Sequence, residues 1–367
     1  MLAVTDADFM VFARLLTAHT QLWTEMVVDS SIIFSKRDGR LDQVLLPCPV
    51  PGPVVCQLGG CSPELLSKAA DVVVNLGYNQ ELNLNCGCPS PLVAGKREFG
   101  AALMLKPTVV WSCLTSMKAA VGADVRVSLK TRLGVDNHDS EEFFQQFLTA
   151  AVPQGPSYSV VVHARKAFLN GLSPEQNRKI PPLNYDRAIR VLGSTDRPWA
   201  LNGGVTSLDA VRSILTVGHK GLQGVMVGRA VTADPCGLLG VADTKIFGER
   251  SNPETAYSRR TILMAYAEYL HDRYPPLPEV NDHTKSKRQR VPSSTVKPVI
   301  HLFTGMDECR KWRQTIESLT RTAACPADVI MGAMEAMEEV WSKPLDRPLV
   351  DGPASGRAAE TVTAHED

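Results

Sequence analysis

One stretch of the sequence, residues 81–104, contains the side chains that are best placed to do chemistry. It begins as a predicted strand in which leucines alternate with polar residues, and it breaks at Gly87, Cys88 and Pro89. In a barrel of alternating strands and helices, the carboxyl ends of the strands face the active site. This position suits a reactive thiol at Cys88, although position alone favours that interpretation no more than the alternative. The alternative is a buried structural thiol, because free cysteine often behaves as a small hydrophobe.

Several other predicted strands also end in polar residues or glycine, which could line the same site. These strand-end residues are Gln57, Asn85, Lys130, His163, Asn202 and Gly228. Some of them also have a plainer explanation. Gln57 could cap a strand, Lys130 could hold its ammonium in water at the rim, and His163 could be a satisfied core histidine. Their position alone therefore assigns them no role.

Two glycine-containing turns follow the last predicted strands of this region. One is Asn202-Gly203-Gly204 and the other is Gly228-Arg229. Glycines at these strand ends let backbone N–H groups approach a phosphate, which is the usual phosphate site of such a barrel. Turns explain most single glycines, but two such sites at successive strand ends favour a phosphate-binding position.

The residues around Cys88 resemble the signature of the tRNA-dihydrouridine synthases. That signature is Asn-x-Gly-Cys-Pro followed by Phe-Gly-x-x-Leu-Met, and it stands here at residues 85–89 and 99–104. The resemblance covers roughly residues 1–320 and is closest to the tRNA-dihydrouridine(20/20a) synthase type. It implies an FMN-dependent oxidoreductase that reduces the C5–C6 double bond of uridine in the D-loop of tRNA, at positions 20 and 20a.

The resemblance assigns the proton donor to Cys88 rather than to Cys86. In the family, reduced FMN gives a hydride from N5 to C6 of the uracil, the thiol supplies a proton to C5, and NADPH regenerates the reduced flavin. A thiol suits this role because it is mostly protonated at neutral pH, and a catalytic acid needs that form. A uracil within folded tRNA must be turned out of its stack to reach the flavin.

The same resemblance implies a set of FMN-binding residues, most of which are the strand-end residues already named. They are Met1, Gln57, Asn85, Lys130, His163, Asn202, Gly203, Gly204, Gly228 and Arg229. Lys130 would hydrogen-bond the N1–C2=O edge of the flavin and stabilise negative charge on the reduced ring. His163 would contact the ribityl–phosphate side. No set of metal ligands is implied.

The resemblance also implies basic and polar residues that contact tRNA. They are Arg132, Arg165, Lys166, Asn177, Arg178, Arg310 and Arg313. Arg259, Arg260 and the basic segment 285–290 are further candidates, although a charge run is more often a solvated linker.

The composition is that of an ordinary globular protein. The chain has 367 residues, of which 44% are hydrophobic and 21% are charged, and its net charge is zero. Affinity for nucleic acid would therefore have to come from local basic patches. The nine cysteines are odd in number and follow neither disulfide nor zinc spacing, which favours a reducing compartment. No apolar run is long enough for a membrane span, so we expect a monomeric cytoplasmic protein, or a plastid or mitochondrial one if the natural chain begins further upstream.

The first 248 residues alternate short apolar strands with helical patterns, which predicts a parallel sheet with crossover helices. Seven strands are expected, at residues 22–28, 53–58, 81–85, 125–130, 158–163, 199–202 and 224–227. The resemblance implies a (β/α)8 TIM barrel, which needs eight strands. We therefore expect the first strand to lie upstream of Met1, or the barrel to close in another way.

Three segments are expected along the chain. Residues 1–248 would form an FMN-binding TIM-barrel catalytic domain, and residues 249–341 a small helical tRNA-binding domain. In the second segment, apolar periodicity predicts helices at residues 254–274, 307–319 and 326–341. Residues 342–367 are polar and are expected to form a disordered tail.

Two other functions fit the same residues. A flavin barrel that acts on a free pyrimidine or on dihydroorotate is one, because a fold alone does not identify a substrate. The helical region with its basic segment favours RNA over a small molecule. A catalytically inactive RNA-binding relative is the other, and flavin absorbance of the purified protein would argue against it.

Overall fold

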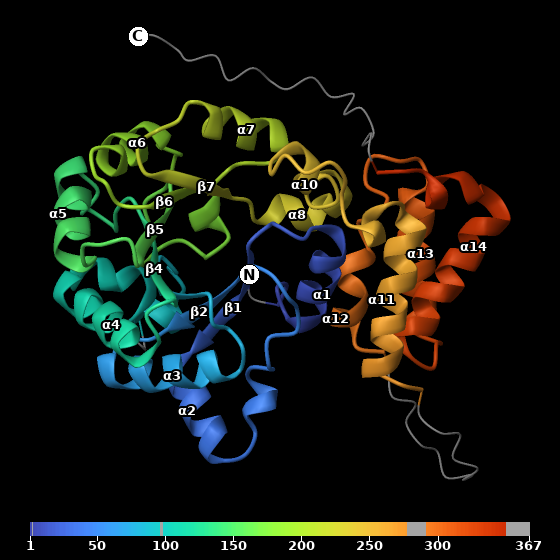
Figure 1. Cartoon of the computed structure of the whole chain (residues 1–367), viewed down its shortest axis with the longest axis horizontal. Coiled ribbons are helices and arrows are strands. Elements are labelled where there is room, and N and C mark those ends of the chain that lie inside the picture. Colours follow the sequence, from blue (N-terminus) through green and yellow to red (C-terminus); the bar gives the residue numbers. More distant parts are fainter. Residues whose placement is uncertain (2, 96–97, 277–290, 350–367) are drawn as a thin grey trace. The chain divides into compact units, whose positions relative to one another are not determined.

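The computed structural model describes residues 1, 3–95, 98–276 and 291–349, except for the side chains of residues 339–342 (Figure 1). Contacts between residues divide the chain into two compact units. The first unit comprises Met1–Arg14 and His19–Val231, and the second comprises Leu15–Ala18 and Thr232–Asp367. The basic segment 285–290 lies outside the described residues.

The first unit is built on one parallel sheet whose seven strands follow the order of the chain. They are β1 (Leu22–Val28), β2 (Val54–Gly59), β3 (Glu81–Cys86), β4 (Arg126–Arg132), β5 (Tyr158–His163), β6 (Trp199–Asn202) and β7 (Leu222–Met226). The seven strands predicted from the sequence are confirmed. Strand β7 begins earlier than predicted because Leu222 pairs with Trp199 of β6. Since all neighbours are parallel, the carboxyl ends of the strands meet at one edge of the sheet.

Strands β1 and β7 are the two edges of this sheet, so the described residues form a half-barrel of the TIM type rather than a closed ring of eight strands. The burial of the strands follows their place. Every residue of β2 is buried, whereas β1 and β7 carry half-exposed side chains. An interior strand is covered by neighbours on both sides, and an edge strand is covered on one side only.

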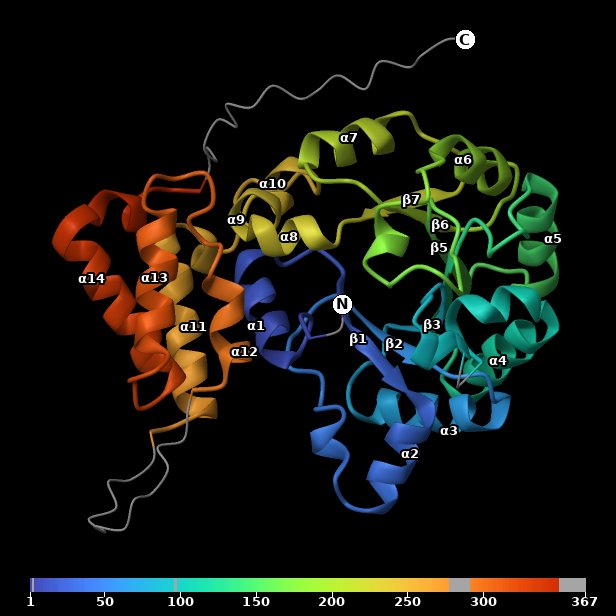
Figure 2. The same ribbon diagram turned by 180° about the vertical axis from the view of Figure 1, so that it is seen from behind.

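Crossover helices connect successive strands and lie on the outer side of the curved sheet, as Figure 1 and the reverse view in Figure 2 both show. They are α2 (Asp29–Arg37), α3 (Pro63–Asn75), α4 (Pro107–Ala120), α5 (Glu141–Ala151), α6 (Tyr185–Gly193) and α7 (Leu208–Thr216), with α1 (Ala7–Leu16) before β1 and α8 (Arg229–Ala233) after β7. Serine side chains fix several of their starts. Ser62 accepts from the N–H of Leu65 at 3.3 Å at the start of α3, and Ser140 accepts from the N–H of Phe143 at 3.1 Å at the start of α5.

The second unit is helical in the part of the chain that the structure describes. Its helices are α9 (Pro235–Leu238), α10 (Ala242–Lys245), α11 (Arg259–Arg273), α12 (Ser293–Val296), α13 (Cys309–Leu319) and α14 (Pro326–Asp346). Trp312 is fully buried in its core, where its indole N–H donates to the carbonyl oxygen of Val299 at 2.8 Å. Helices α9 and α10 precede residue 248 but group with this unit. The predicted division of the chain into a catalytic segment up to residue 248 and a tRNA-binding segment after it therefore stays a prediction.

The predicted ends of three helices differ from those observed, and the smallest difference is that α13 begins at Cys309 rather than at residue 307. Helix α11 begins at Arg259 rather than at residue 254, because Ser258 and Thr261 form a capping box there. The predicted disordered tail was to begin at Ser342, but α14 continues to Asp346 and both Leu345 and Leu349 are buried. The start of the tail is corrected accordingly, and residues 350–367 lie outside the described residues. No helix in the described ranges is both long and apolar enough to span a membrane.

Candidate active site at the carboxyl ends of the strands

The Cys88 loop follows β3 and is held by the side chain of Asn85. The Oδ1 atom of Asn85 accepts hydrogen bonds from the backbone N–H groups of Gly87, at 3.1 Å, and of Cys88, at 3.0 Å. An Asn side chain that bonds the following backbone stabilises a turn without covering it. The side chain of Cys88 is half-buried. The thiol therefore combines a fixed backbone with access from outside.

The second half of the motif, which begins at Phe99, closes on the same loop. The N–H of Ala101 donates to the carbonyl oxygen of Cys88 at 2.9 Å. Gly100 has a φ of +67°, and a β-carbon on this residue would lie 2.6 Å from that oxygen. Only glycine avoids both the strained backbone and the collision. The two halves of the motif are therefore parts of one loop structure.

The two cysteines of the motif differ in access. Cys86 is fully buried, and burial raises the pKa of its thiol. Its strand continues straight into the loop, so Cys88 is the first thiol to emerge from the sheet. Burial excludes Cys86 from contact with a substrate, which supports the choice of Cys88.

Lys130 lies on β4 next to Asn85 of β3 in the register of the sheet. Its Nζ atom donates to Oδ1 of Asn202 at 3.2 Å. Burial, and next the charge of Arg132, lower the pKa of Lys130 to about 8, while Cys88 is near enough to act in the opposite direction. The ammonium is therefore charged at neutral pH and loses its proton in mildly alkaline solution.

His163 ends β5 and packs against the glycine turn after β6. Gly203 has a φ of +118°, and a β-carbon there would lie 2.6 Å from Cδ2 of His163. Burial, followed by nearby positive charges of which that of Lys130 is the largest, lowers the pKa of His163 to about 2. The imidazole is therefore neutral at physiological pH and can exchange hydrogen bonds without carrying charge.

Positive charge gathers at this edge of the sheet. The charges of Lys130, Arg132, Arg165 and Arg229 all act on His163. The Nη1 atom of Arg165 donates to the carbonyl oxygens of Lys179, at 3.3 Å, and Pro181, whereas its Nε atom is buried without a hydrogen-bond partner among the described residues. A buried, unsatisfied N–H in a cationic setting fits an anionic ligand.

Met1 also reaches this edge. A β-carbon on Gly228 would lie 3.7 Å from the sulfur of Met1. The α-amino group of Met1 donates to Oγ1 of Thr5 at 2.6 Å. Burial lowers the pKa of this amino group to about 6, with Glu25 acting in the opposite direction and Lys130 in the same one. The structure thus brings Met1, Gly228 and Lys130 to one place.

Gln57 is buried beneath Asn85, and both ends of its amide are occupied. Its Oε1 atom accepts from Nδ2 of Asn85 at 2.9 Å, and its Nε2 atom donates to Oδ1 of Asn83 at 2.8 Å. Asn83 was not among the candidate site residues. The alternation of Glu81, Asn83 and Asn85 with leucines was the signal for it, because these three share one face of β3.

Arg132 lies inside the first unit and not on its surface. Only 4% of it is exposed, its Nε atom donates to the carbonyl oxygen of Gly87 at 2.9 Å, and its Nη1 atom donates to those of Lys166 at 2.9 Å and Asn177 at 3.0 Å. Burial lowers its pKa to about 10. The structure argues against the predicted RNA contact and makes Arg132 a brace between the Cys88 loop and the segment after β5.

Asn177 is fully buried as well. Its Oδ1 atom accepts from the N–H of Phe168 at 2.8 Å, and its Nδ2 atom donates to the carbonyl oxygens of Phe168, Leu172 and Ser173 at 3.0–3.3 Å. These side-chain hydrogen bonds all go to backbone groups of the loop that contains Asn177. This prediction of a tRNA contact is also corrected, because a side chain closed in by its own loop cannot touch RNA.

The remaining basic candidates of the first unit are more accessible. Arg178 is exposed. Lys166 is half-buried, pairs with Asp139 at 2.8 Å and lies over the ring of Phe168 at 4.7 Å from its centre. Both are close to Arg165, so a basic surface follows β5.

In the second unit, arginines divide into buried and exposed ones. Arg259 is buried and donates from Nε to the carbonyl oxygen of Leu302 at 2.8 Å, and Arg260 is ion-paired with Glu338 and Asp346. The expectation of RNA contact by these two is not supported. By contrast, Arg310 and Arg313 are exposed on α13.

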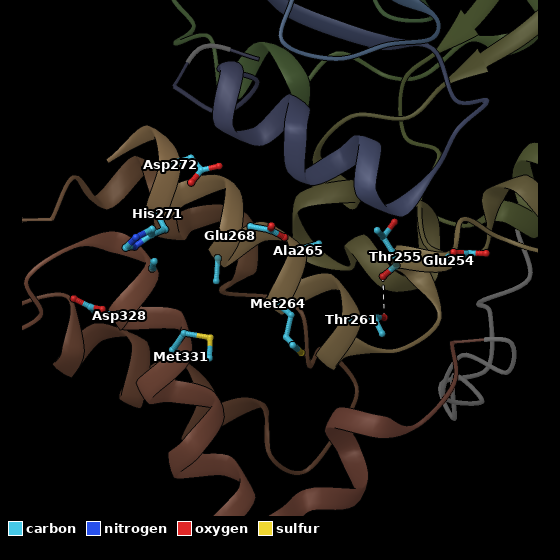
Figure 3. Close-up of a pocket in the computed structure, with 12 residues that line it drawn as sticks. Glu254, Thr255, Thr261, Met264, Ala265, Glu268, His271, Asp272, Asp328 and Met331 are labelled. Carbon is cyan, nitrogen blue, oxygen red and sulfur yellow. Dashed lines mark hydrogen bonds between the residues drawn. The ribbon is translucent and has the colours of Figure 1, made fainter. Parts of the chain in front are cut away.

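The second unit also has an open groove of about 650 Å³ between α11 and α14, shown in Figure 3. Its lining includes Met264 and Met331, which are 52% and 43% exposed. Four carboxylates contribute to its lining, those of Glu254, Glu268, Asp272 and Asp328. Such a surface repels phosphate, so the basic surface of α13 is the better match for RNA.

The described part of the chain contains no group of three or more histidine, cysteine, aspartate or glutamate side chains that could hold a metal ion.

Comparison with known proteins identifies relatives over nearly the whole chain. The family model described as Dihydrouridine synthase (Dus) matches residues 1–329. Proteins named tRNA-dihydrouridine(20/20a) synthase are 36% identical in Vibrio cholerae over 91% of this chain and 94% of the relative, and 34% identical in Shewanella oneidensis over 92% of each chain. The protein of this name from Escherichia coli K12 is 33% identical over 92% of this chain and 90% of the relative. Among solved structures, nitroalkane oxidase from Streptomyces ansochromogenes covers 64% of each chain at 10% identity with a TM-score of 0.36, which is too distant to bear on function.

Proposed function

Because the chain belongs to the dihydrouridine synthase family, we propose that it reduces uridine in the D-loop of tRNA to 5,6-dihydrouridine, at positions 20 and 20a. The observation that carries this proposal is the half-buried thiol of Cys88, which stands on a fixed turn at the carboxyl end of β3 among cationic side chains. The match to 94% of the Vibrio cholerae relative supports the choice of tRNA over a free pyrimidine, because it includes the helical unit.

The residues at this edge fit FMN. Bound and reduced FMN would supply the hydride for C6 of the uracil. Lys130 would face the N1–C2=O edge, where its ammonium stabilises negative charge. The turns at Gly203–Gly204 and Gly228, together with Arg229 and the unsatisfied Nε of Arg165, would hold the phosphate. Neutral His163 would hydrogen-bond the ribityl side, and Asn85, Gln57 and Met1 would complete the floor.

Cys88 would donate a proton from its thiol to C5 of the uracil. The sulfur then carries the negative charge, and Lys130 and Arg132 are both near enough to Cys88 to interact with that charge. The sulfur afterwards takes up a proton from water. The fixed turn keeps the sulfur at one place, so the proton is delivered to one face of the base.

Each unit would contribute basic residues to tRNA binding. In the first unit these residues are Lys166 and Arg178, after β5, because Arg165 is assigned to the FMN phosphate and not to tRNA as first expected. In the second unit they are Arg310 and Arg313, on α13. We assign the residues up to 248 to catalysis and FMN binding, and residues 249–341 to tRNA binding. A second RNA-binding surface is needed because turning a uracil out of its stack costs a few kcal/mol. NADPH is proposed as the reductant.

The test is to incubate the purified, FMN-loaded protein with NADPH and an unmodified tRNA transcript, and to map dihydrouridine along the RNA. We expect product at positions 20 and 20a, and none when FMN is omitted. Reduction of free uracil or oxidation of dihydroorotate, without any product in tRNA, would show that the substrate is a small molecule. The same assay with NADH in place of NADPH decides the reductant.

A further inference from the structure

A chain of buried polar side chains runs through the sheet from the start of β3 to the Cys88 loop. Gln57 of β2, Asn83 of β3 and Ser128 of β4 are direct neighbours in the strand register. The barrel interior of this fold is dominated by branched apolar residues. Buried polar side chains cost free energy unless every group is paired, so their presence here calls for a role beyond packing.

Each member of this relay hydrogen-bonds to the next. The hydroxyl of Ser128 donates to Oε1 of Glu81 at 2.6 Å and accepts from Nδ2 of Asn83 at 2.8 Å. Asn83 accepts from Gln57 at 2.8 Å, and Gln57 accepts from Asn85 at 2.9 Å. The exposed fractions of Glu81, Ser128, Asn83 and Gln57 range from 0% to 8%. The relay thus connects Glu81 to the side chain that holds Cys88.

The relay has one direction, and Glu81 sets it. Arg126 lies 3.1 Å from Oε2 of Glu81 as an ion pair, so the side chain is a carboxylate that only accepts hydrogen bonds. Ser128 must therefore donate to it, which obliges Ser128 to accept from the amide nitrogen of Asn83. The oxygen of Asn83 must then accept from Nε2 of Gln57, and the oxygen of Gln57 must accept from Nδ2 of Asn85. The oxygen of Asn85 therefore faces the N–H groups of Gly87 and Cys88.

We propose that Glu81 and Ser128 are positioning residues, which fix the orientation of the Asn85 amide and through it the backbone of the Cys88 loop. The reversed amide of Asn85 would point an NH₂ group at two backbone N–H groups, and the loop would lose both bonds. The role of the loop in catalysis rests on the proposed function, but the control of Asn85 by Glu81 does not.

The decisive variant is Glu81→Gln, which keeps the shape of the side chain. Arg126 and Gln21 both donate to Oε2, so a glutamine would turn its oxygen toward them and its NH₂ group toward Ser128. We expect the relay to reverse. Hydrogen exchange at the amides of Gly87 and Cys88 should become about tenfold faster, while amides of β5 keep their protection, because a net hydrogen bond is worth about that factor.

Two further variants complete the experiment. Ser128→Ala interrupts the relay and should accelerate exchange less than Glu81→Gln does, because it removes the bias on the Asn85 amide without reversing it. The double variant should resemble Ser128→Ala alone, since residue 81 acts through Ser128. Gln21→Ala is the matched control, because it removes a donor to Oε2 (3.2 Å) and leaves the bond from Ser128 intact. Unchanged exchange at Gly87 and Cys88 in Glu81→Gln, or additive effects in the double variant, would overturn the inference.

Activity gives the second readout. In Glu81→Gln, the transfer to tRNA should slow about tenfold and by more than the reduction of the bound flavin by NADPH. Only the transfer needs the thiol of Cys88 in place, whereas Asn85 and Gln57 are proposed to contact the flavin in both steps. Equal slowing of both steps would indicate a general structural defect and contradict the positioning role. If the parent protein makes no dihydrouridine while the amides still respond, the proposed function fails and the positioning role stands.

Discussion

Arg132, at the carboxyl end of β4, and the two arginines on α13 have opposite environments, although all three were predicted to bind RNA. Arg132 is buried, and its guanidinium donates hydrogen bonds to three backbone carbonyl groups. Arg310 and Arg313 are exposed. A planar guanidinium suits either task, because its donors match carbonyl groups as well as phosphates. Burial decides between them, so interior substitutions should change chemistry or stability, and surface substitutions should change affinity.

The largest effect is expected at the thiol of Cys88. Cys88→Ala should lower the rate of dihydrouridine formation by about 10² to 10⁴, the range for loss of a general acid, while FMN binding and its reduction by NADPH persist. Single-turnover assays on tRNA measure this. Cys309→Ala, another half-buried free cysteine, is the control and should retain full activity. If Cys88→Ala formed dihydrouridine at the rate of the parent protein, Cys88 would not be the proton donor.

The next effect is on stability. Arg132→Met leaves three carbonyl groups without their donor and should lower the free energy of unfolding by about 3 kcal/mol or more. Urea denaturation measures it. Arg190→Met in α6, where the side chain is 59% exposed and pairs with Glu141, should cost no more than about 1 kcal/mol. Should Arg132→Met keep its stability and lose only tRNA affinity, Arg132 would be an RNA contact after all.

The surface arginines should act through affinity alone. Arg310→Ala combined with Arg313→Ala should weaken tRNA binding about tenfold and reduce the slope of log affinity against log salt by about 1 per arginine. Equilibrium binding at several salt concentrations gives both values. The matched control is Arg321→Ala, since this exposed arginine of the same unit pairs with Glu317 at 2.5 Å. If the double variant lost stability and kept its affinity for tRNA, the contrast between buried Arg132 and the exposed arginines of α13 would be wrong.

A smaller effect should follow pH. The pKa of Lys130 is lowered to about 8, so its charge is present below that pH and is lost as the pH rises through it. Flavin reduction by NADPH should therefore slow severalfold between about pH 7 and pH 9, and Lys130→Arg should abolish this transition. No transition near pH 6.5 should come from His163, because its pKa is lowered to about 2. If the rate of flavin reduction stays constant up to pH 9, Lys130 does not act on the flavin.

The smallest effect is expected in the acidic groove of the second unit. Glu268→Gln combined with Asp272→Asn should change tRNA affinity by less than about twofold, because phosphates avoid this face. The binding assay used for α13 measures it. A large gain in affinity would place the RNA next to the groove and weaken the contrast with α13.

Much of the fold could be predicted from the sequence, because apolar residues recur with different periods in strands and in helices. Each predicted strand is present, and Gly100 and Gly203 stand where only glycine fits. The start of α11 was missed because the Ser258–Thr261 capping box competes with the apolar pattern before it. The extent of α14 was missed because its last turn is polar and contains Pro344, and the buried Leu345 was no signal on its own.

By itself, the sequence determined the order of strands, the loop that carries Cys88 and the family to which the chain belongs, because these depend on residues that are near one another in the chain. Only the tertiary structure decided which charged and polar side chains are inside. Arg132 became a brace and Glu81 became the end of a relay, through partners 34 to 60 residues away. Burial and pairing depend on what the fold brings together, and no local pattern records that.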